Sequence, residues 1–174
     1  HQQDLLTGLG TRAVCERRAM LLTEQARASG LSHGLIYLDV DHLNRINDSG
    51  GQSAGDDVLV RVSDTLSSAA PSSKDVFRIA ADQFVILAES VDAQALLALA
   101  EALREKLAST RFYWESQYFS VTASFGAVLL DREMPTALEA IRRADDACAA
   151  AKRAGRNCVQ LYDPRMDRVG RAVD

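Results

Sequence analysis

The order of short apolar runs and amphipathic helices constrains the fold more than any other feature of this sequence. Leu35–Leu38 is a continuous apolar run, which is typical of a strand covered on both faces. Two further apolar runs, Val76–Ile79 and Phe84–Leu87, are separated by four residues and predict a β-hairpin. Because helical patterns lie between the strands, we expect an α/β (α+β) fold with a central mixed sheet surrounded by helices.

The remaining elements follow from periodicity and from capping residues. The expected helices are Thr11 to Ser29, a polar segment that ends at Ser49–Gly51, Gly55 to Ala69, a helix capped by Asp92 that reaches Ala108, and Pro135 to Lys152. The further expected strands are Arg111 to Trp114, Tyr118 to Leu130 and Val159 to Tyr162. Gly126, inside the longest of these strands, predicts a bulge or a close approach of another segment.

Composition limits the classes of partner. The 174 residues are 47% hydrophobic, which is enough for one domain with its own core, and the net charge is −4. This charge does not favour binding to nucleic acid or to an anionic membrane, so a polyanionic ligand would need a local cationic pocket. We expect a cytoplasmic domain without direct membrane contact, in a full-length protein that could still be membrane-anchored. The three cysteines, Cys15, Cys148 and Cys158, are expected to be buried, reduced thiols.

Two carboxylates follow the first buried strand. Asp39 and Asp41 lie where the chain turns from this strand into a helix. Asp39 is well placed to hold Mg²⁺ beside phosphates, although a structural carboxylate would give the same pattern. On an extended strand the two side chains would share a face. Asp41 directly precedes the helix, and we interpret it as the N-cap.

Two other segments each have a structural and a functional interpretation. Asp56 follows a glycine-containing stretch that is not a Gly-Lys-Ser/Thr phosphate loop, so it either caps its helix or accepts hydrogen bonds from a guanine edge. Lys152 lies in the last turn of a helix, and Gly155 stands where a left-handed C-cap is expected. Lys152 and Arg156 are therefore either favourable charges at a helix C-terminus or two cations that bind terminal phosphates.

Five segments of the chain follow one another in a characteristic order: Asp4–Arg12, Leu38–Asp56, Arg78–Leu87, Thr122–Gly126 and Ala144–Asn157. Together they resemble the GGDEF domain, the diguanylate cyclase fold of bacterial cyclic-di-GMP signalling. In the same order, the first two are similar to its DxLTGLxNR and FDxDxFKxINDxxGHxxGD segments, the third occupies the place of its signature hairpin, and the last two are similar to its T-x-S-x-G and ADxALYxAKxxGRN segments. The resemblance extends over about residues 4–162. We therefore expect one GGDEF-like domain over residues 1–162.

The resemblance implies a nucleotide site. Two copies of such a domain, each holding one GTP, condense the nucleotides with the help of Mg²⁺. The implied residues are Asp39, Asp82 and the Val40 backbone carbonyl as metal ligands, Asn47 and Asp56 at the guanine edge, and Lys152 and Arg156 at the β- and γ-phosphates. Asp82 also occupies the acidic, catalytic position of the signature.

The signature itself departs from the family pattern. The paired glycines are replaced by Ala80 and Ala81, and the second acid by Gln83, a neutral isostere. If the turn needs left-handed backbone, each alanine would add roughly 1–2 kcal/mol of strain. Their Cβ atoms would also intrude on the nucleotide. We therefore expect that Asp82 is weakened as a catalytic residue and that the domain makes no cyclic-di-GMP.

The family's inhibitory site for its product also has no counterpart. The window of its RxxD motif reads Pro71–Lys74 and contains neither Arg nor Asp. We expect no inhibitory site for cyclic-di-GMP in this domain.

The leading interpretation is a degenerate, catalytically inactive GGDEF domain that acts as a regulatory module and binds GTP. Two alternatives remain open: an active diguanylate cyclase, and a pure protein-interaction or dimerisation module. The segment Tyr162–Arg168 resembles the connector that leads from GGDEF domains into EAL phosphodiesterase domains. We expect residues 163–174 to begin a linker helix toward such a domain, with Met166, Val169 and Val173 on one face, and a sensory domain on the N-terminal side.

Overall fold

The computed structural model describes residues 2–167. A five-stranded sheet with the order β2-β3-β1-β6-β7 forms its centre. The strands are β1 (His33–Val40), β2 (Val76–Ala80), β3 (Gln83–Ala88), β6 (Ala123–Leu130) and β7 (Val159–Leu161). The β6–β7 pair is parallel and the other three pairs are antiparallel, so the sheet is mixed, as expected.

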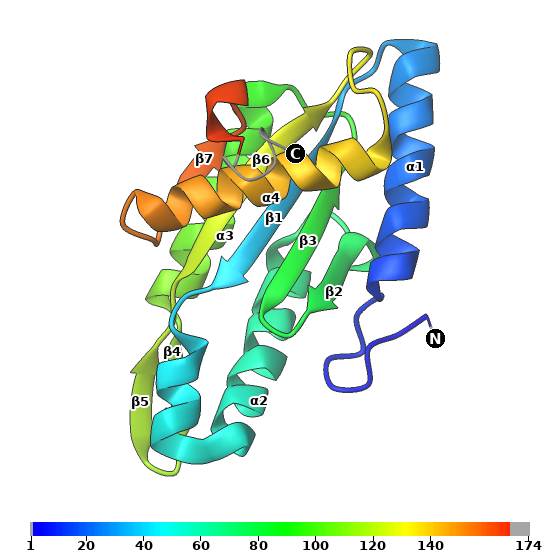
Figure 1. Ribbon diagram of the computed structural model, residues 1–174. Helices are drawn as coiled ribbons and strands as arrows, with labels where there is room; N and C mark the ends of the chain where they lie inside the picture. The colour runs from blue at the N-terminus through cyan, green and yellow to red at the C-terminus, as the bar shows by residue number, and fades with distance from the viewer. Residues whose placement is uncertain (1, 168–174) are drawn as a thin grey trace.

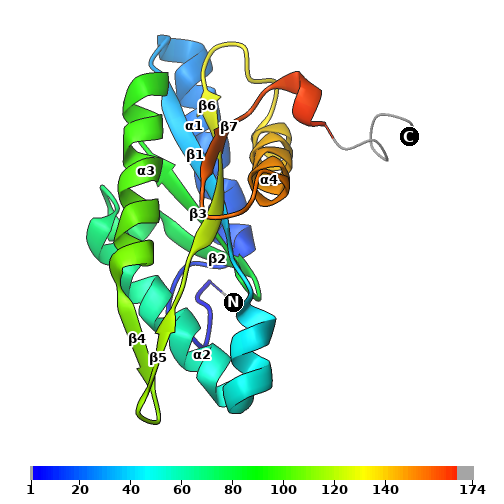
Figure 2. The ribbon, with the colours of Figure 1, turned by 90° about the vertical axis from the view of Figure 1, so that its left-hand side faces the viewer.

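Helices cover both faces of this sheet. Helices α1 (Arg12–Ser29) and α4 (Ala137–Arg153) lie on one face, and α2 (Leu43–Ala69) and α3 (Ala93–Ser109) lie on the other (Figures 1 and 2). Successive side chains of β1 point to opposite faces of the sheet, so this strand contributes to the core on both sides. Leu35 and Tyr37 pack in the cluster with α1 and α4, whereas Ile36 and Leu38 pack in the cluster with α2 and α3. All of β1 is buried, which explains its continuous apolar pattern.

Helix α2 bends at a glycine. It includes both the polar segment that ends at Ser49–Gly51 and the helix from Gly55 to Ala69, which the sequence predicts as two separate helices. Gly51 has the non-helical angles φ 79° and ψ 179°. The bend therefore falls within the expected break. Beyond it, Val58, Val62 and Leu66 are buried, as the spacing predicts.

One expected strand is two strands. The β-type run from Tyr118 to Leu130 is divided at Val121–Thr122, and its first part pairs with β4 (Arg111–Trp114) as β5 (Gln117–Ser120). The β4–β5 hairpin extends beyond the central sheet beside α2 (Figure 2). At the division, the Thr122 carbonyl accepts a hydrogen bond of 2.9 Å from the Asp41 N–H, directly beyond the last residue pair of the β1–β6 ladder.

Gly126 lies at a close approach and not at a bulge. Its register opposite Tyr37 is continuous with the rest of the β1–β6 pair. A Cβ atom at this position would lie 2.2 Å from the Ala144 carbonyl oxygen of α4. Glycine therefore lets α4 pack directly on the sheet.

One expectation at helix α4 needs correction. The N-cap of α4 is Thr136, whose Oγ1 accepts a hydrogen bond of 3.0 Å from the Glu139 N–H, so Pro135 precedes the helix and does not open it. Beyond β7, Pro164–Met166 forms a 3₁₀ turn, and the remainder of the expected linker helix, with Val169 and Val173, lies outside the described residues.

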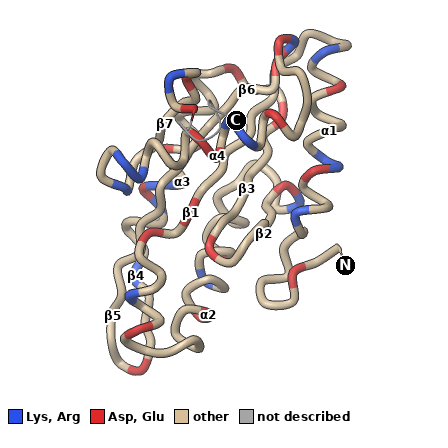
Figure 3. The backbone as a smooth tube through the Cα atoms, in the orientation of Figure 1, with Lys and Arg blue, Asp and Glu red and all other residues tan. Residues whose placement is uncertain are grey.

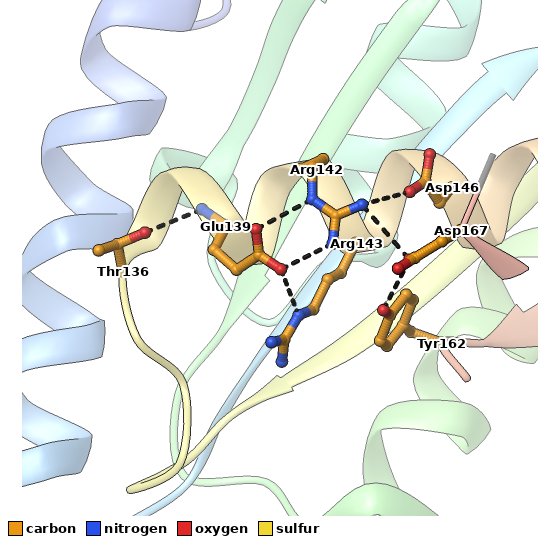
Figure 4. A network of polar contacts seen from close by, with 7 residues as sticks. All are labelled: Thr136, Glu139, Arg142, Arg143, Asp146, Tyr162 and Asp167. Carbon is orange, nitrogen blue, oxygen red and sulfur yellow. Dashed lines mark hydrogen bonds and ion pairs between the residues drawn. The ribbon is translucent and has the colours of Figure 1, made fainter. Parts of the chain in front are cut away.

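This turn is fixed to α4 by a network of charges, shown in Figure 4. Arg142 pairs with Glu139 at 2.7 Å, with Asp146 at 2.6 Å and with Asp167 at 3.3 Å. The Tyr162 hydroxyl donates to Asp167 at 2.8 Å.

Within residues 2–167, Cys15 and Cys148 are buried, Cys158 is partly exposed, and all three are free thiols. None of the helices in this range is long and apolar enough to cross a membrane.

Candidate functional site

A polar cavity of about 240 Å³ lies where β1 ends. Four parts of the chain meet there: the end of β1, the start of α2, the β2–β3 turn and the end of α4 (Figure 1). The lining residues are Asp39, Val40, Asp41, His42, Leu43, Asn44, Asp82, Lys152 and Arg156. In Figure 3, acidic positions at the end of β1 and at the β2–β3 turn lie near basic positions at the end of α4. The cavity therefore combines both charges that a metal–phosphate ligand would require.

The Asp39 carboxylate is buried at the centre of these contacts. Its Oδ2 forms an ion pair with the Lys152 ammonium and accepts a hydrogen bond of 3.3 Å from Nε2 of Gln83. Gln83 is held in turn by Tyr37, whose hydroxyl donates to Oε1 at 2.8 Å. Burial alone would lower the pKa of Lys152, but the hydrogen bond and the charge of Asp39 raise it above its ordinary value. Lys152 is therefore a firmly charged ammonium.

Asp82 lies beside Asp39. Its backbone carbonyl accepts a hydrogen bond of 2.9 Å from the Val40 N–H, which ties the β2–β3 turn to the end of β1. Burial, and then the neighbouring charge of Asp39, raise the pKa of Asp82 above its ordinary value. Such mutual repulsion is what a bound cation would relieve, so these two side chains fit Mg²⁺ chemically. No group of three or more His, Cys, Asp or Glu side chains with metal-binding geometry occurs in the described chain.

The β2–β3 turn contradicts one expectation. Neither Ala80 nor Ala81 is among the non-glycine residues with positive φ in the described chain, so the two alanines carry no left-handed strain. The register shifts between Arg78 and Ala80, and the turn tightens to Ala81 and Asp82. The Arg78 guanidinium stabilises this turn, because its Nε and Nη2 donate hydrogen bonds of 3.0 and 2.8 Å to the Ala81 carbonyl. A different turn geometry therefore replaces the one that glycines would serve.

Asp41 is not the N-cap of α2, as the sequence suggested. His42 takes that position with φ 57°, and no side chain caps the helix. The Asp41 carboxylate instead accepts hydrogen bonds from Thr122 Oγ1 at 2.6 Å, Ser124 Oγ at 2.7 Å and the Asn157 N–H at 3.1 Å. Asp41 thus joins the end of β1 to the start of β6 and to the loop after α4. It is a buried structural carboxylate that shapes one wall of the cavity.

Arg156 reaches the cavity from the loop after α4. Gly155, with φ 115°, provides the left-handed turn that the sequence indicates, and Arg156 follows with φ 65°. Its Nε lies 4.0 Å from Oδ1 of Asp41, and the side chain is 45% exposed. Lys152 and Arg156 thus line one cavity.

Asn47 and Asp56 are not among the residues that line this cavity. They lie on opposite sides of the bend in α2, where the Asn47 side chain packs against Gly55: a Cβ atom there would lie 1.8 Å from Oδ1 of Asn47. This Oδ1 atom is buried and has no hydrogen-bond partner among the described residues. Asp56 lies inside the helix beyond the bend and accepts a hydrogen bond of 3.3 Å from Gln52, so it is not an N-cap. The bend therefore places the two expected guanine-edge residues near each other.

Sequence reasoning missed the residues that support the site. Tyr37 orients Gln83, and the hydroxyls of Thr122 and Ser124 hold Asp41. Strand alternation could have indicated Tyr37, because it shares a face with Asp39 two residues later. The pairing of Asp41 with residues more than 80 positions away has no local signal.

Comparison with known proteins agrees with this architecture. The family described as "Diguanylate cyclase, GGDEF domain" matches residues 1–158. The chain is 31% identical over 163 residues to a probable diguanylate cyclase, DgcE of Escherichia coli, covering 94% of this chain and 15% of that protein. It is 32% identical over 165 residues to the diguanylate cyclase DgcS of Shewanella oneidensis, covering 94% and 53%. The chain therefore spans only part of the length of these relatives.

Solved structures show the same fold. The GGDEF domain of YfiN (TpbB) from Pseudomonas aeruginosa superposes with a TM-score of 0.90 at 25% identity, covering 97% of this chain and 99% of that one. The diguanylate cyclase SiaD from the same organism, solved in complex with its activator SiaC, gives 0.86 at 30% identity, covering 92% and 61%. Family match, sequence relatives and fold agree: this chain is a GGDEF domain of cyclic-di-GMP signalling, and it belongs to the GGDEF family.

Proposed function

We propose that this GGDEF domain is a regulatory module that binds GTP with Mg²⁺ but does not make cyclic-di-GMP. The observation that carries the proposal is the cavity at the end of β1, which keeps both cations and two carboxylates while Gln83 occupies the place of the second signature acid. The retained cations and carboxylates would support nucleotide binding, whereas the replacement of the second acid by Gln83 would remove catalysis.

The cations support binding of a triphosphate. Lys152 and Arg156 line the cavity and would contact the β- and γ-phosphates, each contact contributing about 1.5–3 kcal/mol. Asn47 and Asp56 would add preference for guanine, because adenine presents an acceptor where guanine presents a donor. The Cβ atoms of the turn alanines oppose binding by crowding the nucleotide. The balance favours an affinity in the micromolar range or weaker.

The carboxylates support a place for the metal ion. Asp39, Asp82 and the Val40 carbonyl would hold Mg²⁺, which would neutralise phosphate charge when bound. Gln83 contributes no negative charge, and its amide already donates to Asp39. The acidic set is therefore smaller than the one that a full GGDEF signature provides.

An active diguanylate cyclase remains the second candidate, and one observation favours it. The turn at Ala80 and Ala81 is unstrained, so the substitutions do not distort the hairpin. Against it stand the missing acid and the added Cβ atoms.

As a regulatory module the domain would act on neighbouring domains. We propose that GTP binding tunes an attached EAL phosphodiesterase domain under control of an N-terminal sensory domain, on the cytoplasmic side of any membrane anchor. Cyclic-di-GMP would not bind at Pro71–Lys74, where Ser72 accepts a hydrogen bond from the Lys74 N–H in a tight turn. Incubation of the domain with GTP and Mg²⁺, followed by a thermal shift assay and product analysis, tests the proposal. A stabilising shift without product supports it, and turnover would contradict it.

A further inference from the structure

Lys152 and Gln83 meet on a single oxygen atom. Both donate to Oδ2 of Asp39, from α4 and from β3 respectively. The Asp39 side chain is 6% exposed and that of Lys152 is 35% exposed. The carboxylate is therefore withdrawn from solvent, and the ammonium is its main source of compensating charge.

The proposed function assigns Asp39 and Lys152, the two partners of this ion pair, to different ligands. Asp39 would bind the metal ion and Lys152 the phosphates. Their ion pair occupies the Asp39 oxygen and the Lys152 ammonium at the same time. A cation that binds Oδ2 of Asp39 would therefore meet the ammonium of Lys152, and a phosphate would bind an ammonium that is already paired.

We propose that Lys152 competes with a divalent cation for Asp39, and that the nucleotide relieves this competition by drawing Lys152 to its phosphates. Cation and nucleotide then bind cooperatively, because each frees a side chain that the other uses. Gln83, oriented by Tyr37, is a positioning residue in this exchange: it keeps its hydrogen bond to Asp39 when Lys152 leaves. The nucleotide half of this inference rests on the proposed function, whereas the competition at Asp39 does not.

The competition is tested first without nucleotide. Mn²⁺ is titrated into the domain, and the free ion is followed by electron paramagnetic resonance. Lys152→Met should tighten Mn²⁺ binding at least about fivefold, at the low end of ordinary coupling between sites. Arg153→Met is the matched control, because it removes the same charge from the exposed end of α4 and, within residues 2–167, Arg153 forms no ion pair with Asp39; it should change the affinity less than twofold.

Folding of the variants is checked by circular dichroism, since removal of Lys152 leaves the Asp39 carboxylate less compensated. Lys152→Gln, which keeps a hydrogen-bond donor, should lie between wild type and Lys152→Met. Equal Mn²⁺ affinity in wild type and in both Lys152 variants would overturn the competition, as would a tightening in Arg153→Met as large as that in Lys152→Met.

The cooperativity is tested with GTP. Its dissociation constant is measured in EDTA and in excess Mg²⁺ for wild type and for Lys152→Met. Chelation of Mg²⁺ by GTP in solution is the same for both proteins, so a difference between their ratios comes from the protein. The dissociation constant in EDTA divided by that in Mg²⁺ should be several-fold larger for wild type than for Lys152→Met. Equal ratios for the two proteins would overturn the exchange. Absence of GTP binding in wild type would instead contradict the proposed function, while the Mn²⁺ titration still decides the competition.

Discussion

The Tyr37 hydroxyl donates a hydrogen bond of 2.8 Å to Oε1 of Gln83, and this contact fixes which end of the amide faces Asp39. Burial raises the pKa of Tyr37, so the hydroxyl remains a proton donor at neutral pH. Because the amide nitrogen then points at Asp39, Gln83 stabilises a carboxylate that an acid in its place would repel.

The substitution Gln83→Glu should therefore lower the stability of the metal-free domain. Tyr37 can still donate to the new carboxylate, but three acids would then lie together, at a cost of about 1–2 kcal/mol. Thermal unfolding should show a lower midpoint in EDTA and recovery in millimolar Mg²⁺. The exposed Gln117→Glu adds the same charge on the β4–β5 hairpin and should show neither effect. An unchanged midpoint in EDTA would contradict the role assigned to Gln83.

Gly55→Ala should remove discrimination between GTP and ATP. The added methyl group would collide with Oδ1 of Asn47, which lies 1.8 Å from the new Cβ position, and would displace the side chain from the bend in α2. The ratio of the two dissociation constants, measured by calorimetry, should fall toward one. The neighbouring Ser53→Ala, at an exposed position, should keep the wild-type ratio. If Gly55→Ala discriminates as well as wild type, Asn47 does not read the base.

Acidification should destabilise the domain through His33. Its Nδ1 accepts a hydrogen bond of 2.8 Å from the Ser90 N–H, and its buried Nε2 has no hydrogen-bond partner within residues 2–167. Burial lowers the pKa of His33 from its ordinary value of 6.5; the charge of Glu89 raises it and that of Arg18 lowers it. The unfolded chain therefore takes up the proton first as the pH falls, so this contribution to stability is lost below about pH 6.5.

The fall in melting temperature between pH 7.5 and pH 5.5 should be smaller in His33→Asn, whose side-chain oxygen can accept from Ser90 but does not titrate. Identical falls in wild type and variant would assign the pH dependence to other groups.

Arg142→Met should loosen the segment that leaves the domain. The change removes the ion pairs to Glu139, Asp146 and Asp167, and should cost about 1–3 kcal/mol (Figure 4). Hydrogen exchange of residues 162–167 should accelerate. Arg61→Met is the matched control, because it removes the same charge and an ion pair, to Asp57, on helix α2, and exchange of residues 162–167 should then stay near wild type. Equal exchange in both variants would show that Arg142 does not hold the turn.

Periodicity predicted most of the fold because the strands and helices are marked locally. The buried run in β1 and the stripe on α3 reflect contacts that repeat along one element, and the glycine in β6 marks a single close approach to α4. The division between β5 and β6 was not predictable, since both parts have β-type residues and differ only in the strand with which they pair, β4 or β1.

The site was predictable only in part. Lys152 and Arg156, which flank a helix end, line one cavity with Asp39 and Asp82, whereas Asn47 and Asp56 do not line it. The strain expected at Ala80 and Ala81 was wrong, because the register shift after Arg78 gives the turn another geometry. The pair of Lys152 with Asp39 joins residues 113 positions apart, and such partners are chosen by the folded sheet.

Calorimetric titration of the domain with GTP in Mg²⁺, with the cell contents then analysed for cyclic-di-GMP by mass spectrometry, tests the central claim most directly. The account predicts measurable heat with a dissociation constant in the micromolar range or weaker, a smaller response to ATP, and no product. No heat at millimolar GTP would leave only the interaction module, and accumulation of cyclic-di-GMP would show a working cyclase. Either result would contradict the account.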